Sequence, residues 1–300
     1  MNRESVNPRT VLVTGCSTGI GRVTAVTLAR AGHTVIATMR HPEEHPDLPA
    51  LATDERLPLH VAALDVEDDE SVASTVDAAI AAHGHIDVLV NNAGIGGSGP
   101  IEEAPLDLFR RTFETNVLGA VRCSRAVLPA MRARGSGAIV NVSSLAGRVV
   151  LGAHGPYTAS KFALEAVSEA LAQEVAPFGI RVAIIEPGVI ATPILQKARP
   201  PLPSSIYASH RRLRALLAAS FRAYQAPPEL VADAIRRFIE SDDRTLRHPV
   251  GPDFPVLMGW RARLSDEEWV VLGALDDDEW CRRVTEATGL DVAAELQRLV

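Results

Sequence analysis

Residues 10–21 read Thr-Val-Leu-Val-Thr-Gly-Cys-Ser-Thr-Gly-Ile-Gly, and more of the architecture follows from them than from any other segment. The run Thr10-Val-Leu-Val-Thr14 predicts a short buried strand, and Gly15, Gly19 and Gly21 predict a tight turn into a helix that starts near residue 18. Glycine has no Cβ, so backbone N–H groups in such a turn can approach a pyrophosphate at the positive end of the helix. This order of elements indicates a dinucleotide-binding fold, with a merely structural loop as the alternative.

Helical and strand patterns alternate along the rest of the chain, which predicts one α/β domain on a doubly wound parallel sheet of about seven strands, of the Rossmann type. Strands are expected at 10–14, 34–38, 59–64, 86–91, 137–143, 180–186 and 246–250. Helices are expected at 19–31, 69–82, 105–134, 157–176 and 228–240, and the third is either continuous or broken near Pro129.

Composition limits the classes of protein that this chain can represent. With 300 residues, of which 47% are hydrophobic and 22% charged, the chain can bury one large core. A net charge of −7 argues against nucleic-acid binding. No apolar run approaches the roughly 18 residues that span a bilayer, and no apolar leader opens the sequence, so we expect a cytoplasmic protein. Cys16, Cys123 and Cys281 form no Cys-x-x-Cys, so neither a disulfide framework nor a metal site is expected.

Tyr157 and Lys161 lie four residues apart in a predicted helix, so their side chains share one face. An ammonium beside a phenol favours phenolate and lowers the tyrosine pKa from its usual value near 10 toward the range of a proton-transfer catalyst. Alone, the pair is weak evidence, because such pairs are common by chance on solvated helix faces. Its interpretation depends on residues elsewhere in the chain.

Polar or glycine-containing segments follow most of the predicted strands. Because the carboxyl ends of parallel strands meet at one edge of the sheet, these segments are expected to gather where a dinucleotide and a small substrate bind. They are Thr38-Met-Arg40, Asp65, Asn91-Asn-Ala-Gly94, Ser143-Ser144 and Pro187-Gly188.

Together these motifs resemble the short-chain dehydrogenase/reductase family. The resemblance rests on Thr14-Gly-x-x-x-Gly-x-Gly21, Asp65, Asn91-Asn-Ala-Gly94, Asn116, Ser144, Tyr157-x-x-x-Lys161 and Pro187-Gly-x-x-x-Thr192. Two further segments, Ala37-Thr-Met-Arg40 and Arg247-His-Pro-Val-Gly-Pro252, are similar to hydroxysteroid and retinol dehydrogenase-like branches.

The resemblance implies four catalytic residues. Tyr157 exchanges a proton with the substrate oxygen while the nicotinamide exchanges a hydride with the adjacent carbon. Ser144, thirteen residues before Tyr157, hydrogen-bonds that oxygen, and Lys161 holds the nicotinamide ribose and lowers the Tyr157 pKa. Asn116 relays protons from Lys161 through a water, or only bonds the backbone of a neighbouring strand, or does both.

The resemblance also implies the cofactor contacts and no metal. Asp65 is expected to accept from the adenine amino group, Asn91 to contact the adenosine ribose, and Ile190 and Thr192 to bond the carboxamide. The full expected set is Gly15, Ser17, Thr18, Gly19, Ile20, Gly21, Arg40, Asp65, Val66, Asn91, Ala93, Gly94, Tyr157, Lys161, Pro187, Gly188, Ile190 and Thr192.

The end of the second strand favours NADP(H) over NAD(H). A carboxylate there would bond the ribose 2′-hydroxyl and repel a 2′-phosphate, but the chain has Thr38, with Arg40 two residues later. Arg40 is suited to pair with a 2′-phosphate, although a solvated loop arginine is the alternative. The glycine turn adds no second basic residue, because Ser17 and Thr18 stand there.

The C-terminal third divides by charge. Residues 1–261 form the predicted catalytic domain, whose lid at 193–228 has six cationic and no acidic residues and includes an amphipathic helix. Its apolar stripe covers a lipophilic substrate or only closes the core. Residues 262–300 form a predicted acidic, helical extension, and 266–300 hold ten acidic residues against three arginines. These acids either pack against the basic lid or simply add solubilising charge.

The sequence therefore predicts an NADP(H)-dependent oxidoreductase that interconverts a small lipophilic secondary alcohol and its ketone, or an aldehyde. A non-catalytic NADP(H)-binding regulator, an NAD-dependent dehydrogenase of the same family and a cofactor-recycling epimerase or dehydratase are the alternatives. The resemblance also implies a homodimer or homotetramer, paired through the helices at 105–134 and 157–176.

Overall fold

The protein is described here from a computed structural model, which covers residues 7–193 and 205–299. Its centre is a seven-stranded sheet in the order β3-β2-β1-β4-β5-β6-β7, and each neighbouring pair of strands is parallel. The doubly wound parallel sheet predicted from the sequence is confirmed. Its strands are β1 (Thr10–Val13), β2 (Thr34–Met39), β3 (Leu59–Ala63), β4 (Val88–Asn91), β5 (Gly137–Val142), β6 (Ile180–Pro187) and β7 (Arg247–Val250).

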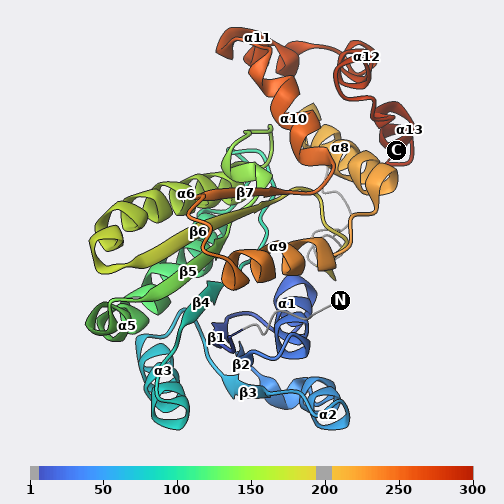
Figure 1. Ribbon diagram of the computed structural model, residues 1–300. Coiled ribbons are helices and arrows are strands. Elements are labelled where there is room, and N and C mark those ends of the chain that lie inside the picture. The colour runs from blue at the N-terminus through green and yellow to red at the C-terminus, as the bar shows by residue number, and fades with distance from the viewer. Residues whose placement is uncertain (1–6, 194–204, 300) are drawn as a thin grey trace, which may run out of the picture.

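Helices cover both faces of the sheet and bury an apolar core on each (Figure 1). Side chains alternate between the faces of a strand, so Val11 and Val13 enter one core while Leu12 enters the other. One core is closed by α1 (Gly19–Arg30), α2 (Asp47–Asp54) and α9 (Glu229–Glu240), and the other by α3 (Asp69–His83), α5 (Gly119–Arg134) and α6 (Gly155–Val175). Of these helices, only α2 lay outside the predicted set.

A third apolar core lies among the C-terminal helices, which stand together at one end of the molecule (Figure 1). It joins α8, the amphipathic helix predicted in the lid, to the acidic C-terminal segment, which is helical as expected. Part of the predicted lid, residues 194–204, lies outside the described residues. The helices are α8 (Ala208–Tyr224), α10 (Asp253–Ala262), α11 (Asp266–Val271), α12 (Asp277–Thr288) and α13 (Val292–Gln297).

The helix expected at 105–134 is interrupted, but not at Pro129. It consists of α4 (Leu106–Phe113), one π-helical turn (Glu114–Leu118) and α5. Pro129 lies inside α5 on its exposed side, where water can bond the carbonyl that the proline leaves without a donor. The alternative of a break at Pro129 is therefore wrong, and the irregular turn falls at the predicted site residue Asn116.

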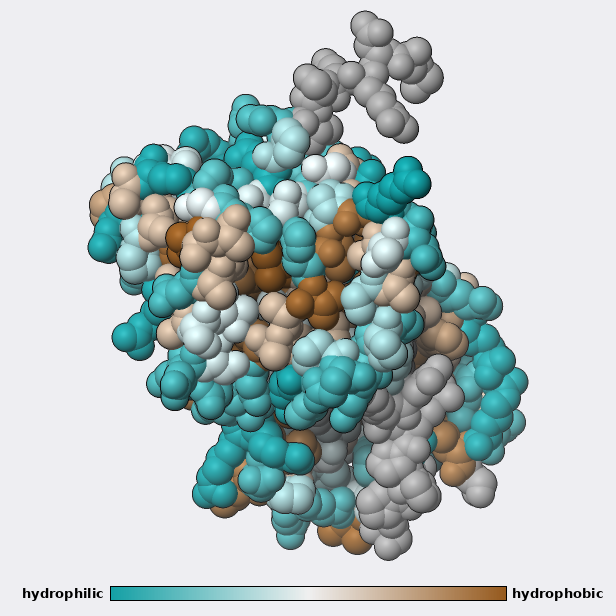
Figure 2. All heavy atoms as spheres, turned by 90° about the horizontal axis from the view of Figure 1, so that it is seen from below, coloured by the Kyte–Doolittle hydropathy of each residue, from teal (hydrophilic) through white to brown (hydrophobic). Residues whose placement is uncertain are grey.

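The outer surface carries both hydrophilic and apolar residues. Figure 2 shows the face seen from below in Figure 1, where hydrophilic residues predominate around a band of apolar ones. Across residues 7–193 and 205–299, none of the helices is long and apolar enough to cross a membrane.

Candidate active site

The glycine turn between β1 and α1 has the geometry that its sequence predicts. Gly15 and Gly19 adopt positive φ angles of 74° and 61°, which disfavour other residues. A Cβ at Gly21 would collide with the Asn92 amide and the Gly15 carbonyl. Asn92 Nδ2 donates to Thr14 O at 2.9 Å and to Gly15 O at 3.2 Å, so this amide joins the end of β4 to the turn.

The first turn of α1 fits the pyrophosphate of a dinucleotide. Its N-cap, Thr18, is extended and makes no side-chain capping hydrogen bond, and the first turn holds no acidic residue. The leading N–H groups and the positive end of the helix dipole are therefore not neutralised by the chain's own side chains. Ser17, Thr18, Gly19, Ile20 and Gly21 all belong to this segment, as the sequence predicts.

The end of β4 is fastened to β1 by contacts of Thr14 and Asn92, two motif residues for which the sequence predicted no role. Thr14 Oγ1 accepts from the backbone N–H groups of Asn92 at 3.1 Å and Ala93 at 3.0 Å. The close approach depends on Gly15, because a Cβ there would lie 2.8 Å from Ala93 Cα. The signal that could have identified Thr14 and Asn92 is their position: each flanks a glycine-bearing strand end.

The Asn91 side chain is engaged inside the protein. Its Nδ2 lies 2.9 Å from Asn141 Oδ1 on β5, 3.1 Å from Ser124 Oγ and 3.3 Å from Ala120 O on α5. This amide therefore ties two strands to a helix. The ribose contact expected of Asn91 stays a prediction.

The adenine side of the expected site is formed by the ends of β2 and β3. Thr38 is buried and its hydroxyl donates to Val13 O at 3.0 Å, whereas Arg40 is exposed. Asp65 follows β3 and accepts from the Glu67 N–H at 3.0 Å. Val66 packs against the start of α5, where a Cβ at Gly119 would lie 2.8 Å from Val66 Cγ2.

Ser144, Tyr157 and Lys161 converge at the ends of β5 and β6. Ser144 Oγ lies 3.4 Å from Pro187 O and hydrogen-bonds the Tyr157 side chain. Lys161 is 5% exposed, donates to Val142 O at 2.8 Å, and places Nζ 5.7 Å from the centre of the Tyr157 ring. The predicted trio is thus brought together.

The electrostatics of the trio differ from the expectation. Burial raises the pKa of Tyr157 above its usual value, and the hydrogen bond with Ser144 only partly offsets this. Burial also lowers the pKa of Lys161 to about 8, against the opposing effect of the Glu165 carboxylate. The net pKa of Tyr157 is raised because the desolvation of the phenol is the largest effect, and the expectation that Lys161 itself lowers this pKa stays a prediction.

Asn116 lies in the π-helical turn and bonds the segment after β4. It accepts from Ile95 N at 2.8 Å, donates to Ile95 O at 3.0 Å, and donates to Ser160 Oγ at 2.9 Å. A Cβ at Gly94 would lie 3.2 Å from Asn116 Oδ1 and 3.8 Å from Lys161 Nζ, so this glycine leaves room beside both groups. Asn116 therefore bonds backbone, as the alternative had it, but in the loop after β4 rather than in a strand, and the proton relay stays a prediction.

The segment after β6 lies beside the glycine turn. A Cβ at Gly19 would lie 3.5 Å from Thr192 Cβ, so the two ends of the predicted cofactor site meet there. Asp253, a buried residue that was missed, accepts from Val189 N at 2.7 Å and from Ser220 Oγ at 3.1 Å. Pro187, Gly188, Ile190 and Thr192 are thereby tied to α8 and α10. The sequence gives only a weak signal for this, an acid soon after a glycine.

His154 was also missed, although it flanks the trio. Its ring stacks on Tyr157 with centroids 5.0 Å apart and an interplanar angle of 24°. Burial lowers the pKa of His154 to about 4, so the ring is neutral at pH 7. Its position three residues before Tyr157 was the available signal.

The acidic extension packs against the basic lid. Arg211 and Arg212 on α8 both pair with Asp277, and Arg212 lies over the Trp280 ring at 5.5 Å. Trp269 Nε1 donates to Val150 O at 2.9 Å, which joins the extension to the segment after β5. For these residues, the interpretation as merely solubilising charge is wrong.

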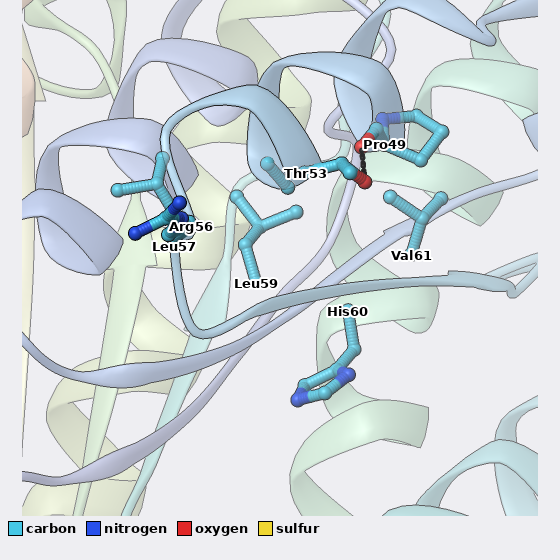
Figure 3. Close-up of a pocket in the computed structure, with 8 residues that line it drawn as sticks. Pro49, Thr53, Arg56, Leu57, Leu59, His60 and Val61 are labelled. Atoms are coloured by element: carbon cyan, nitrogen blue, oxygen red, sulfur yellow. Dashed lines mark hydrogen bonds between the residues drawn. The ribbon is translucent and has the colours of Figure 1, made fainter.

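A shallow pocket between α2 and β3 lies apart from these residues. Figure 3 shows it, with the Thr53 hydroxyl donating to Pro49 O at 3.0 Å. Its lining, residues 49–61, includes none of the predicted site residues. We assign no chemistry to it.

Comparison with known proteins places this geometry in a family. Residues 9–202 match the family model of the short chain dehydrogenases. The chain is 37% identical over 272 residues to "Uncharacterized oxidoreductase YusZ" of Bacillus subtilis (strain 168), covering 88% of this chain and 96% of that protein.

Two further similarities are narrower. Human "Retinol dehydrogenase 8" is 45% identical over 190 residues, which cover 62% of this chain and 60% of that protein. Among solved structures, that of "ElxO with NADP Bound" has a TM-score of 0.70 and 27% identity, covering 83% of this chain and 99% of that one. The chain belongs to the short-chain dehydrogenase family and is an NAD(P)-dependent oxidoreductase.

Proposed function

We propose that this oxidoreductase interconverts a lipophilic secondary alcohol and its ketone, or an aldehyde, with NADP(H), and that Tyr157 is the acid/base. The observation that carries the proposal is the convergence of Ser144, Tyr157 and Lys161 at the strand edge that also holds the glycine turn. The cofactor supplies or removes the hydride. In reduction, the Tyr157 hydroxyl gives its proton to the carbonyl oxygen, while Ser144 bonds that oxygen.

The phenol of Tyr157 is protonated at neutral pH and so holds the proton that reduction requires, while its burial makes it a weaker acid than a free tyrosine. Oxidation runs the same transfer in reverse. We propose that Asn116 and Lys161 return the proton to solvent, a role supported by the approach of both side chains to Gly94, where a Cβ would lie 3.2 Å from Asn116 Oδ1 and 3.8 Å from Lys161 Nζ.

The lipophilic substrate class is supported by apolar side chains near the start of α6. Ile101 is 68% exposed and lies against Gly155, where a Cβ would collide with it. Ile206, 84% exposed, joins the same segment through its N–H to Glu103 Oε1 at 3.3 Å. Val150 is half exposed beside Trp269. Such a rim favours an apolar ligand, and the similarity to a retinol dehydrogenase points the same way.

The test is a steady-state screen of NADPH and NADH oxidation, and of the reverse reactions, against steroid, retinoid and long-chain carbonyls and short polar ketones. We expect turnover of at least one lipophilic substrate. Across the substrate series, kcat/KM should fall as the apolar surface of the substrate becomes smaller. A protein that binds NADPH but turns over no carbonyl or alcohol would instead be a regulator. Faster turnover of short polar ketones would contradict the substrate class.

Preference for NADP(H) is supported by the end of β2. Thr38 uses its hydroxyl inside the protein, and Arg40 is exposed with no ion pair among the described residues. We expect Arg40→Asp to lower kcat/KM for NADPH roughly 10- to 100-fold, while that for NADH changes little, because one charge-assisted phosphate contact is lost.

The matched control is Arg237→Asp, an exposed arginine on α9, which is expected to change neither value. Equal losses with both cofactors in Arg40→Asp would contradict the assignment of the 2′-phosphate to Arg40.

The homodimer or homotetramer stays a proposal of the same kind. Leu118 and Phe162, 47% and 40% exposed, lie on the two helical segments expected to pair subunits. Sedimentation of the full chain tests it.

A further inference from the structure

Two buried carboxylates lie behind the proposed catalytic trio. Glu165 on α6 is 5% exposed and Glu186 on β6 is fully buried. Burying an ionised carboxylate is costly unless it is paired with a cation or well hydrogen-bonded. The burial of two carboxylates beside the proposed active site therefore requires a physical explanation.

Their pairing with arginines is incomplete. Arg247 Nε lies 3.0 Å from Glu165 Oε2 and 3.7 Å from Glu186 Oε1, and the same guanidinium bonds Glu169 at 2.6 Å. Arg148 bonds Glu186 Oε1 at 2.8 Å. The second oxygen of Glu186, Oε2, has no hydrogen-bond partner among the described residues, whereas Glu165 Oε1 lies beside Ser143, whose hydrogen bond opposes the rise that burial causes in the Glu165 pKa.

Lys161 is the nearby cation with no ionic partner of its own. It lies one turn before Glu165 on the same face of α6, and its ammonium bonds only the neutral carbonyl of Val142 among the described residues. Burial of Lys161 favours the loss of its proton, and the negative charge of Glu165 opposes this effect. Lys161 and Glu165 are thus i,i+4 neighbours on α6 that act on one another electrostatically without a direct ion pair.

Glu165 also reaches the other end of the trio. A Cβ at Gly147 would lie 2.8 Å from Ser143 Oγ and 3.3 Å from Glu165 Oε1, so this carboxylate lies close to the serine that precedes Ser144. Arg247, which holds Glu165, belongs to β7 at the edge of the sheet. A chain of contacts therefore runs from β7 through α6 to the end of β5.

We propose that Glu165 is a positioning residue, the counter-charge that keeps Lys161 protonated at the working pH, and that Arg247 holds it in place. The proposal rests on the function proposed above only for its kinetic consequence. The groups that face Glu165 are Lys161 and Glu169 on α6, Glu186 on β6, Arg247 on β7 and Ser143 after β5, and Arg148 reaches it through Glu186.

The sign of the expected effect follows from the charges. A negative neighbour favours the protonated ammonium, so Glu165→Gln lowers the Lys161 pKa further below its value of about 8. If activity requires a charged Lys161, the alkaline limb of kcat/KM moves to lower pH in the variant. We expect the pKa of Lys161 and the midpoint of the alkaline limb of kcat/KM each to fall by about one pH unit.

The composition of the chain makes a direct measurement simple. Lys161 and Lys197 are its two lysines, so protein labelled with [¹³C]lysine gives two side-chain signals, and Lys197→Arg leaves one. The Lys161 Cε shift is titrated in the full-length protein in the Lys197→Arg background, with and without Glu165→Gln. Glu165→Asp, which keeps the charge, is expected to recover most of the wild-type midpoint.

Glu169→Gln is the matched control. Glu169 bonds the same arginine from the same helix, but its side chain is half exposed and lies two turns from Lys161, so it is expected to leave the titration unchanged. An unmoved Lys161 midpoint in Glu165→Gln, or an equal shift in Glu169→Gln, would overturn the proposal. A shifted titration with an unmoved alkaline limb would support the counter-charge and count against the catalytic role of Lys161.

If Glu165→Gln does not fold because Arg247 loses one of its carboxylate partners, the double variant Glu165→Gln/Arg247→Gln removes both members of that pair. The Lys161 midpoint is again expected to fall, since Glu165, and not Arg247, is the charged group that raises the Lys161 pKa. An unchanged midpoint in the double variant would equally overturn the proposal.

Discussion

Replacing Tyr157 with phenylalanine is expected to lower kcat for the best carbonyl substrate by about 10³-fold, within the range that a positioned general acid contributes. The change removes only the hydroxyl that bonds Ser144 and keeps the ring that stacks on His154. Binding of the nicotinamide cofactor, measured by fluorescence titration, should weaken far less than kcat falls, because Tyr157 is one of many expected cofactor contacts and the residues of the glycine turn are untouched.

A tyrosine elsewhere supplies the control. Tyr224 ends α8 and packs against the third core, so Tyr224→Phe should leave kcat within about twofold of wild type. If Tyr157→Phe kept a tenth or more of the wild-type kcat at saturating cofactor, a phenol could not be the proton donor, and the assignment would have to pass to another group.

Ending the chain after Arg263 is the second change with a large expected effect, because it removes α11, α12 and α13 from the third core. Arg212 is 5% exposed and would lose Asp277, the Leu275 carbonyl and the Trp280 ring together. A buried charge without partners and an uncovered apolar face cost roughly 5 kcal/mol or more. We expect the Tm to fall on the order of 10 °C and KM for the lipophilic substrate to rise.

Val270 provides a matched control for this truncation. It lies on the removed helix α11 but is 74% exposed, so Val270→Ser should change the free energy of unfolding by no more than about 0.5 kcal/mol. A truncated protein with the wild-type Tm and KM would show that the extension does not support the lid. It would also favour the proposed division into a catalytic domain at 1–261 and a dispensable extension at 262–300.

The sheet and its binding edge could be predicted because they depend on local patterns. Short apolar runs such as Val11–Val13 indicate buried strands, and the glycine turn after them needs the positive φ values found at Gly15 and Gly19. Since parallel strands end on the same side, the motifs after each of them were expected to meet, and Ser144, Tyr157 and Lys161 do meet.

The remaining features depend on tertiary contacts that no local pattern records. The raised pKa of Tyr157 comes from burial, which cannot be judged from its spacing to Lys161. Asp253 bonds Val189 from 64 residues away, and Asp277 meets Arg212 from 65 residues away. The sequence showed that lid and tail carry opposite charge, but not whether they touch.

The π-helical turn at 114–118 has a geometric consequence for the segment around it. A turn that holds one more residue than usual advances every following side chain by about 100° around the axis, since an α-helix has 3.6 residues per turn. The apolar stripe therefore changes direction there: α4 packs against α6, whereas α5 packs against α3, β4 and β5. A helical wheel drawn through 106–134 in a single register would mix these two interfaces. Deleting one residue from the turn would align the two apolar stripes along one face of the helix and would rotate Asn116 away from Ile95.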